Sequence, residues 1–132
     1  MKIESLNHVA LMVKDAEKTA NFFDRYCGMK VVHMRKDGDL CVEWIRHPDQ
    51  KDSFMLVLIE SVADLSPIGG TMDHLGFYVE SRSDVDEIAA KAKAEGILIE
   101  GPQYAGPVVG YYCIVQDPDG NSIEFSCEQL RV

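Results

Sequence analysis

The chain has 132 residues, 46% of them hydrophobic, and a formal net charge of −9. This length and composition are ordinary for one globular domain with a sizeable core. The negative charge argues against nucleic acid and anionic membrane surfaces as partners, since both attract positively charged proteins.

Neither a membrane span nor an export signal is evident in the sequence. No apolar run reaches the roughly 18 residues of a transmembrane helix. The N-terminal residues lack the basic region and continuous apolar core of a signal peptide, so we predict a cytoplasmic protein. The cysteines form no CxxC pair and are predicted to be reduced thiols: Cys27, Cys41, Cys113 and Cys127.

The first predicted module covers about residues 1–62. Alternation over 7–13 predicts a strand with His8 on the face opposite its most apolar residues. A helix is predicted between Asp15, a favourable N-cap, and Gly28, a favourable residue just past a helix end. Its predicted buried stripe is Ala16, Ala20, Phe23 and Cys27. Three strands are then predicted at about 29–36, 40–46 and 54–60.

The second predicted module covers about residues 72–132 and follows a linker at about 61–72 that carries Ser66-Pro67 and Gly69-Gly70. It opens with a strand bearing His74. A helix capped by Ser83 or Asp84 and ended by Gly96 comes next. We predict strands near 97–100, 111–116 and 121–127, with a loop from Gly101 to Gly110.

Each half of the chain therefore reads as one βαβββ unit, and His8 and His74 occupy equivalent places in the two copies. We predict an α+β fold in which paired βαβββ modules form a curled mixed sheet around a cavity. Equivalent residues of paired modules converge on one place. The two histidines are therefore expected to lie close together on the cavity side.

A carboxylate completes a candidate metal site. Alternation in the last strand places Glu124 on one face with Ser122 and Ser126. Two histidines and one carboxylate suit Fe(II), Mn(II), Ni(II), Co(II) or Zn(II). We therefore predict one divalent metal ion bound by His8, His74 and Glu124.

Two segments of the chain resemble a known superfamily. The stretch from His8 to Val32, which contains FFDRYCGMKVV, and the ending DPDGNSIEF are similar to the vicinal-oxygen-chelate superfamily of glyoxalases, bleomycin-resistance proteins and extradiol dioxygenases. The resemblance spans nearly the whole chain and implies paired βαβββ modules and a divalent metal. It implies the same three ligands: His8, His74 and Glu124.

The sequence departs from one branch of that superfamily. Glyoxalase I enzymes carry a fourth ligand, Glu or Gln, in the last strand of the first module. The matching position here is predicted to be Val57, and Glu60 lies beyond the expected site. The resemblance therefore argues against glyoxalase I activity proper.

Several other side chains are candidates for contact with a substrate. Tyr104, Tyr111 and Tyr112 are candidate acids or contacts, and alternation places only one of the last two inward. Arg46 is a candidate for binding an anionic group. The remaining histidines have no counterpart in the other module and are predicted at the surface: His33 and His47.

Three functions are considered, of which the first is favoured and the other two are alternatives. The first is a metal-dependent lyase, isomerase or transferase acting on a small molecule that chelates the metal through two oxygens, in which Glu124 is also the candidate catalytic group. The second is an Fe(II) ring-cleaving dioxygenase of the extradiol type. The third is a protein that sequesters a ligand without catalysis, as bleomycin-resistance proteins do. A homodimer is also expected, because the superfamily often pairs modules between chains.

Overall fold

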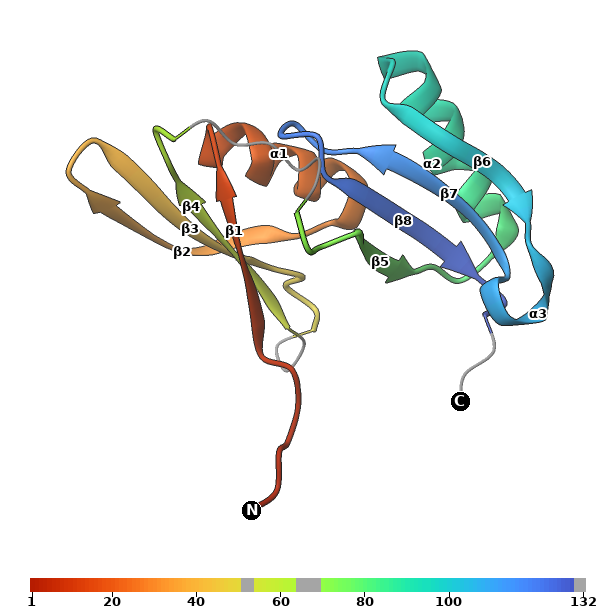
Figure 1. The fold of residues 1–132 in the computed structure, drawn as a ribbon, viewed down its shortest axis with the longest axis horizontal. Coiled ribbons are helices and arrows are strands. Elements are labelled where there is room, and N and C mark those ends of the chain that lie inside the picture. Colours follow the sequence, from red (N-terminus) through yellow and green to blue (C-terminus); the bar gives the residue numbers. More distant parts are fainter. Residues whose placement is uncertain (51–53, 64–69, 130–132) are drawn as a thin grey trace. The chain divides into compact units, whose positions relative to one another are not determined.

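The computed structural model describes residues 1–50, 54–63 and 70–129. These residues form two compact units, Met1–Leu65 and Ser66–Val132. In each unit a helix packs on one face of a four-stranded sheet (Figure 1). No helix among the described residues is long and apolar enough to cross a membrane.

The first unit has the element order βαβββ. Its sheet order is β1-β4-β3-β2, with β1 parallel to β4 and the other neighbours antiparallel. Its elements are β1 (His8–Val13), α1 (Ala16–Cys27), β2 (Lys30–Asp37), β3 (Leu40–Arg46) and β4 (Met55–Glu60).

The second unit repeats this plan with one added short helix. Its sheet order is β5-β8-β7-β6, again with only the first pair parallel. Its elements are β5 (His74–Tyr78), α2 (Arg82–Glu95), β6 (Leu98–Tyr104), α3 (Gly106–Val109), β7 (Tyr111–Gln116) and β8 (Ser122–Cys127). The predicted pair of βαβββ modules is confirmed.

Both long helices end as the sequence predicts, but one begins elsewhere. Asp15 caps α1 by accepting a hydrogen bond from the Lys18 amide, and Gly28 ends it in the left-handed conformation with φ of 66°. The N-cap of α2 is Ser81, so the prediction of Ser83 or Asp84 was wrong. Asp84 instead completes a capping box, because its side chain accepts from the Ser81 amide.

The segment predicted as a loop from Gly101 to Gly110 is largely ordered secondary structure. Strand β6 runs to Tyr104, well past the predicted end at residue 100, and α3 follows it. Gly101 and Pro102 lie in a bulge of β6, described below, whereas Gly106 begins α3 and Gly110 follows it. Residues 64–69, which hold most of the predicted linker motifs, lie outside the described residues.

Each sheet has one apolar face beneath its helix and one face that carries the histidine. Leu11 and Val13 are buried, whereas His8 and Met12 are exposed on the opposite face of β1. In β5 the same alternation separates Leu75 and Phe77 from His74. We call the side bearing His8 or His74 the histidine face of each sheet.

Candidate metal centre

His74 and Glu124 face each other across neighbouring parallel strands. In the register of β5 and β8, His74 pairs with Ser122 and Gly76 pairs with Glu124. The distance from His74 Nε2 to Glu124 Oε2 is 3.6 Å. A Cβ atom on Gly76 would approach Glu124 Oε2 to 3.3 Å, so the absence of a side chain there leaves the carboxylate its place beside the imidazole.

Asp73 fixes the orientation of the His74 ring. Its Oδ2 atom lies 2.7 Å from His74 Nδ1. Because a carboxylate can only accept, Nδ1 carries the proton, and in the neutral imidazole Nε2 then offers a lone pair. The Nε2 atom and the Glu124 Oε2 atom, 3.6 Å apart, are then both acceptors. A cation between them satisfies both, which is the usual arrangement of a metal-binding histidine held by an outer carboxylate.

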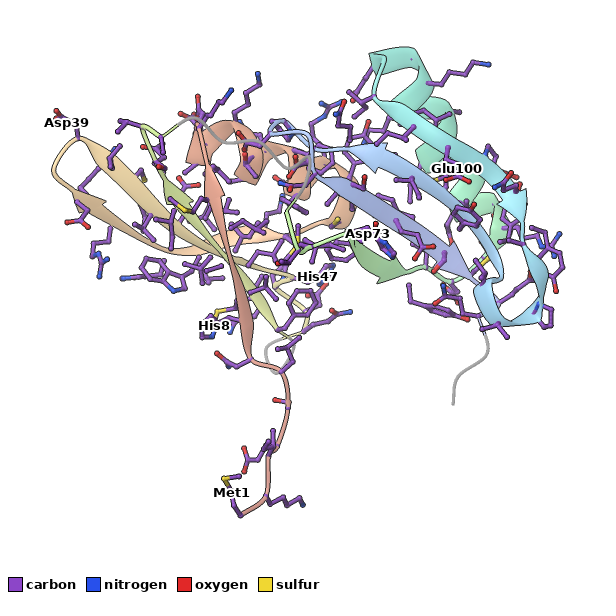
Figure 2. The ribbon with its side chains drawn as sticks, in the orientation of Figure 1. Met1, His8, Asp39, His47, Asp73 and Glu100 are labelled. Carbon is purple, nitrogen blue, oxygen red and sulfur yellow. The ribbon has the colours of Figure 1, made fainter. Side chains whose placement is uncertain are left out.

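The first module repeats this arrangement at His8, which lies at the start of β1 (Figure 2). Asn7 Oδ1 lies 2.8 Å from His8 Nδ1. Each histidine is therefore anchored through Nδ1 by the residue directly before it, which leaves Nε2 for a ligand. The sequence signal for this, an Asn or Asp before each repeated His, was missed in the sequence analysis.

The donor set fits a divalent ion. Two ligand atoms about 2.0–2.2 Å from one ion lie roughly 3.0–3.5 Å apart, close to the spacing of the His74 and Glu124 atoms. The Glu124 side chain is only 13% exposed, so the carboxylate is well shielded from water. The described residues of neither unit alone gather three His, Cys, Asp or Glu side chains that could hold a metal.

A family model matches nearly the whole chain. The model of the Glyoxalase/Bleomycin resistance protein/Dioxygenase superfamily matches residues 5–125. The chain belongs to this superfamily.

Similar proteins span the same length. An uncharacterized protein of Pseudomonas aeruginosa is 35% identical over 125 residues, covering 95% of this chain and 89% of its own. A lactoylglutathione lyase of Neisseria meningitidis is 28% identical over 124 residues, which cover 91% of this chain and 88% of the lyase. The fosfomycin resistance protein FosX of Listeria monocytogenes, solved with Mn(II) and 1S,2S-dihydroxypropylphosphonic acid, has a TM-score of 0.73 at 22% identity, covering 95% and 93%.

The register identifies the counterpart of Glu124 in the first module. Val57 pairs with Ala10 in β4 and β1, as Glu124 pairs with Gly76 in β8 and β5. The position equivalent to Glu124 is therefore occupied by a hydrocarbon side chain. This agrees with the interpretation of the sequence.

Glu60 does not supply the missing carboxylate. It alternates with the buried Leu56 and Leu58 and so belongs to the face beneath α1. Its Oε1 accepts a hydrogen bond of 3.0 Å from the Ala16 amide, and its Oε2 accepts one of 2.8 Å from the Cys41 amide. Glu60 thus joins the start of α1 to the start of β3.

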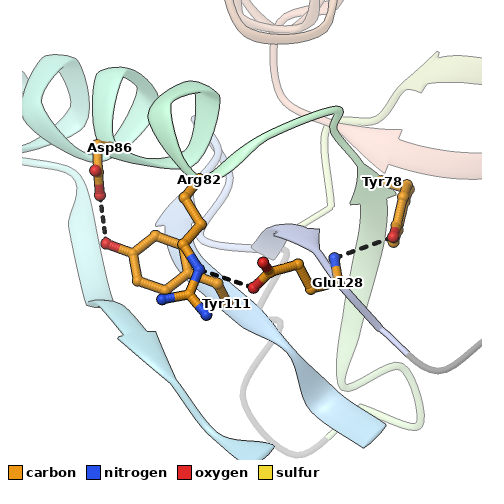
Figure 3. A network of polar contacts seen from close by, with 5 residues as sticks. All are labelled: Tyr78, Arg82, Asp86, Tyr111 and Glu128. Atoms are coloured by element: carbon orange, nitrogen blue, oxygen red, sulfur yellow. Dashed lines mark hydrogen bonds and ion pairs between the residues drawn. The ribbon is translucent and has the colours of Figure 1, made fainter. Parts of the chain in front are cut away.

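The two neighbouring tyrosines of β7 lie on opposite faces, as alternation predicts. Tyr111 lies on the α2 side, where its hydroxyl donates to Asp86 (Figure 3). Tyr112 pairs with Ser126 and so lies on the histidine face with Glu124. Of the two, only Tyr112 remains a candidate for contact with a substrate.

Tyr112 belongs to a polar cluster that the sequence analysis missed. Its hydroxyl donates to Glu100 Oε1 at 2.6 Å, and Gln103 Nε2 donates to the Tyr112 hydroxyl at 2.6 Å. The hydrogen bond to Glu100 is the largest cause that raises the pKa of Tyr112. We call Glu100, Gln103 and Tyr112 the Glu100 cluster.

The other candidate residues are spread over the two units. Arg46 is half-buried on β3, and its counterpart across the strand pair is Lys30. The exposed His33 has its ring centroid 4.9 Å from that of Trp44.

His47 is half-buried rather than at the surface, because it packs against Gly28. Tyr104 is exposed, with the Arg82 guanidinium 5.0 Å from its ring centroid.

The four cysteines form no disulfide bonds with one another, and three of them do not resemble an activated nucleophile. Burial raises the pKa of the Cys113 thiol to about 12, and it also raises the pKa values of Cys41 and Cys127. A raised pKa suppresses the reactive thiolate. These residues therefore serve packing.

Proposed function

We propose that the protein is an enzyme that depends on one divalent metal, held by Nε2 of His8, Nε2 of His74 and the carboxylate of Glu124. We further propose that it acts on a small molecule that presents two adjacent oxygens. The observation that carries the proposal is the His74–Glu124 pair, in which the hydrogen bond to Asp73 leaves the unprotonated Nε2 atom 3.6 Å from a carboxylate oxygen.

The residues of the site would bind the metal and orient its ligands. Asp73 and Asn7 hold the imidazoles, Gly76 makes room for the Glu124 carboxylate, and Ser122 and Ser126 flank it on β8. A metal bound to three protein ligands keeps coordination positions for a chelating substrate and supplies Lewis-acid stabilisation of a developing oxyanion. A lyase, isomerase or transferase reaction fits this chemistry.

Titration with Zn(II) tests the ligand assignment. We expect the metal-free protein to bind one equivalent, measured in competition with a chromophoric chelator. His74→Ala and Glu124→Gln should weaken binding by more than the roughly 10- to 100-fold that loss of an outer hydrogen-bond partner causes. The bound metal should also raise the melting temperature of the wild type, since it binds only the folded state.

His33→Ala is the matched control, because His33 is exposed and lies outside the proposed ligand set. It should bind Zn(II) as the wild type does. Unchanged metal affinity in His74→Ala would show that the assignment is wrong.

The reaction is expected to differ from that of the lactoylglutathione lyases. In this superfamily that activity goes with a fourth metal ligand, and Val57 stands at its position here. We expect negligible turnover of the methylglyoxal–glutathione hemithioacetal with Ni(II), Co(II) or Zn(II) supplied. Turnover of about 10 per second, an ordinary enzyme rate, would contradict this expectation.

A further inference from the structure

A bulge in β6 turns two polar side chains toward the same tyrosine. Glu100 pairs with Ile114 and Gln103 pairs with Tyr112, so three steps along β6 match two steps along β7. Without the extra residue, Glu100 and Gln103 would point to opposite faces of the sheet. The bulge places both on the histidine face.

Gly101 makes this bulge possible. Its φ is 85°, a conformation that side chains with a Cβ rarely adopt. A Cβ atom there would also lie 2.6 Å from the carbonyl oxygen of Tyr112, too close for any other residue. The backbone of β6 is thus shaped to present the Glu100 cluster, and bulges of this kind often re-aim side chains beside active sites.

The hydrogen bonds within the cluster leave acceptors on its exposed side. Glu100 Oε1 accepts from the Tyr112 hydroxyl and, at 2.9 Å, from Gln103 Nε2. Because the Gln103 amide nitrogen faces these two partners, its Oε1 atom is the end left for a ligand. Glu100 Oε2 is the second such acceptor. Glu100 has no ion pair with any described residue.

The cluster lies in line with the candidate metal ligand. Glu124 pairs with Ile114, and Ile114 pairs with Glu100, so the three form one row on the histidine face. Neighbouring strands are about 4.8 Å apart, which places the backbones of Glu124 and Glu100 about 10 Å from each other. A small molecule anchored at Glu124 therefore reaches Glu100 by crossing the apolar side chain of Ile114.

We propose that the Glu100 cluster binds a cationic, hydrogen-bond-donating group, such as a primary ammonium, at the far end of the substrate. This inference rests on the proposed function, since it assumes that the chelating end of the same molecule is held at His74 and Glu124. The unneutralised Glu100 carboxylate attracts a cation and repels an anionic group. The two remaining acceptor oxygens match an ammonium, which can only donate.

Three hydroxamates with the same chelating head test the inference. The para-aminomethyl, para-ethyl and para-carboxymethyl benzohydroxamates differ only in charge and hydrogen bonding at the far end. Their affinities for the Zn(II)-loaded protein are measured by isothermal titration calorimetry. We expect the aminomethyl compound to bind about fivefold more tightly than the ethyl compound, as for a partly exposed ion pair, and the carboxymethyl compound to bind most weakly.

Glu100→Gln keeps an acceptor for the Tyr112 hydroxyl but removes the charge. In this variant the ratio of the aminomethyl and ethyl affinities should fall to about one. Glu87→Gln is the matched control, because it removes one charge from an exposed position of α2, and it should keep the wild-type ratio.

The outcomes separate the two proposals. Equal affinities of the three hydroxamates for the wild type, or a preference that survives Glu100→Gln, would overturn the inference and leave the metal site standing. Failure of the ethyl compound to bind the Zn(II)-loaded wild type would overturn the proposed function, and the inference with it.

Discussion

Each proposed histidine ligand depends on a single neighbouring side chain for its orientation. Asp73→Ala and Asn7→Ala leave the ligands in place but free the imidazole rings to rotate and to change tautomer. We expect each variant to lower the affinity for Zn(II) by about 10- to 100-fold, measured by chelator competition. Asp73→Asn, which retains an acceptor oxygen, should lose less affinity for Zn(II) than Asp73→Ala does.

Asp39→Ala controls for the loss of a negative charge, because Asp39 is an exposed residue at the turn between β2 and β3. It should retain the wild-type metal affinity. If Asp73→Ala also retains it, the Asp73 hydrogen bond does not orient the ligand.

Glu43 is a buried carboxylate that lowers the stability of the first unit at neutral pH. It is 7% exposed, and its Oε2 atom has no hydrogen-bond partner among the residues that the structure describes. Burial is the largest cause that raises the pKa of Glu43, and the nearby carboxylates of Glu17, Glu60 and Asp15 raise it further. Lys36 opposes them.

The sign of the pH dependence follows from that raised pKa. The folded state holds the Glu43 proton more tightly than the unfolded state does, so folding is favoured at low pH. That stability is lost as the pH rises from the ordinary glutamate pKa of 4.5 through the raised value. We expect Glu43→Met to raise the melting temperature by about 3–6 °C at pH 7.

The same measurement well below pH 4.5 provides the check, because the wild-type carboxyl is then largely protonated in both the folded and the unfolded state. The advantage of Glu43→Met should shrink there, while the exposed Glu87→Gln variant should shift the melting temperature little at either pH. If the melting temperature of Glu43→Met exceeds that of the wild type by the same amount at both pH values, packing rather than charge explains the increase.

At the scale of elements, the capping box gives α2 its defined start. The Ser81 hydroxyl accepts from the Asp84 amide, and the Asp84 carboxylate accepts from the Ser81 amide. We expect Ser81→Ala to cost about 1 kcal/mol. This lowers the melting temperature by about 3–5 °C, measured by circular dichroism.

Ser83→Ala separates the observed cap from the one predicted from sequence. Ser83 lies inside the first turn of α2, so its loss should lower the melting temperature by much less than that of Ser81. A larger effect at Ser83 would restore the cap that the sequence analysis favoured.

Local sequence signals predicted most elements of this fold. Period-two alternation separated the histidine face from the apolar face in β1 and β5, because each strand has one side packed beneath a helix. Gly28 and Gly96 marked both helix ends, since each adopts a left-handed conformation. These features depend on neighbours in the chain, so sequence alone suffices for them.

The features that sequence did not predict depend on pairing between strands. The bulge at Gly101 looked like a loop, because Gly and Pro usually interrupt strands. The bulge can be recognised only from the pairing of β6 with β7. The same pairing brings the residues of the Glu100 cluster together. The placement of Glu60 beneath α1 likewise depends on amides that lie 44 and 19 residues away.

At the scale of the whole molecule, the proposed ligands come from both units. His8 belongs to the first unit, and His74 and Glu124 belong to the second. We propose that the protein is a homodimer and that units of this kind pair either within one chain or between two chains. Symmetric pairing of repeated modules brings equivalent residues such as His8 and His74 to one place.

Anomalous X-ray scattering from crystals of the Zn(II)-loaded protein tests the central claim most directly. Data collected on both sides of the zinc absorption edge locate the ion without assumptions about its ligands. We predict one peak for each pair of modules, within bonding distance of His8 Nε2, His74 Nε2 and the Glu124 carboxylate. A zinc ion bound without His74 and Glu124, or bound at Glu43 or Glu60 instead, would contradict the account.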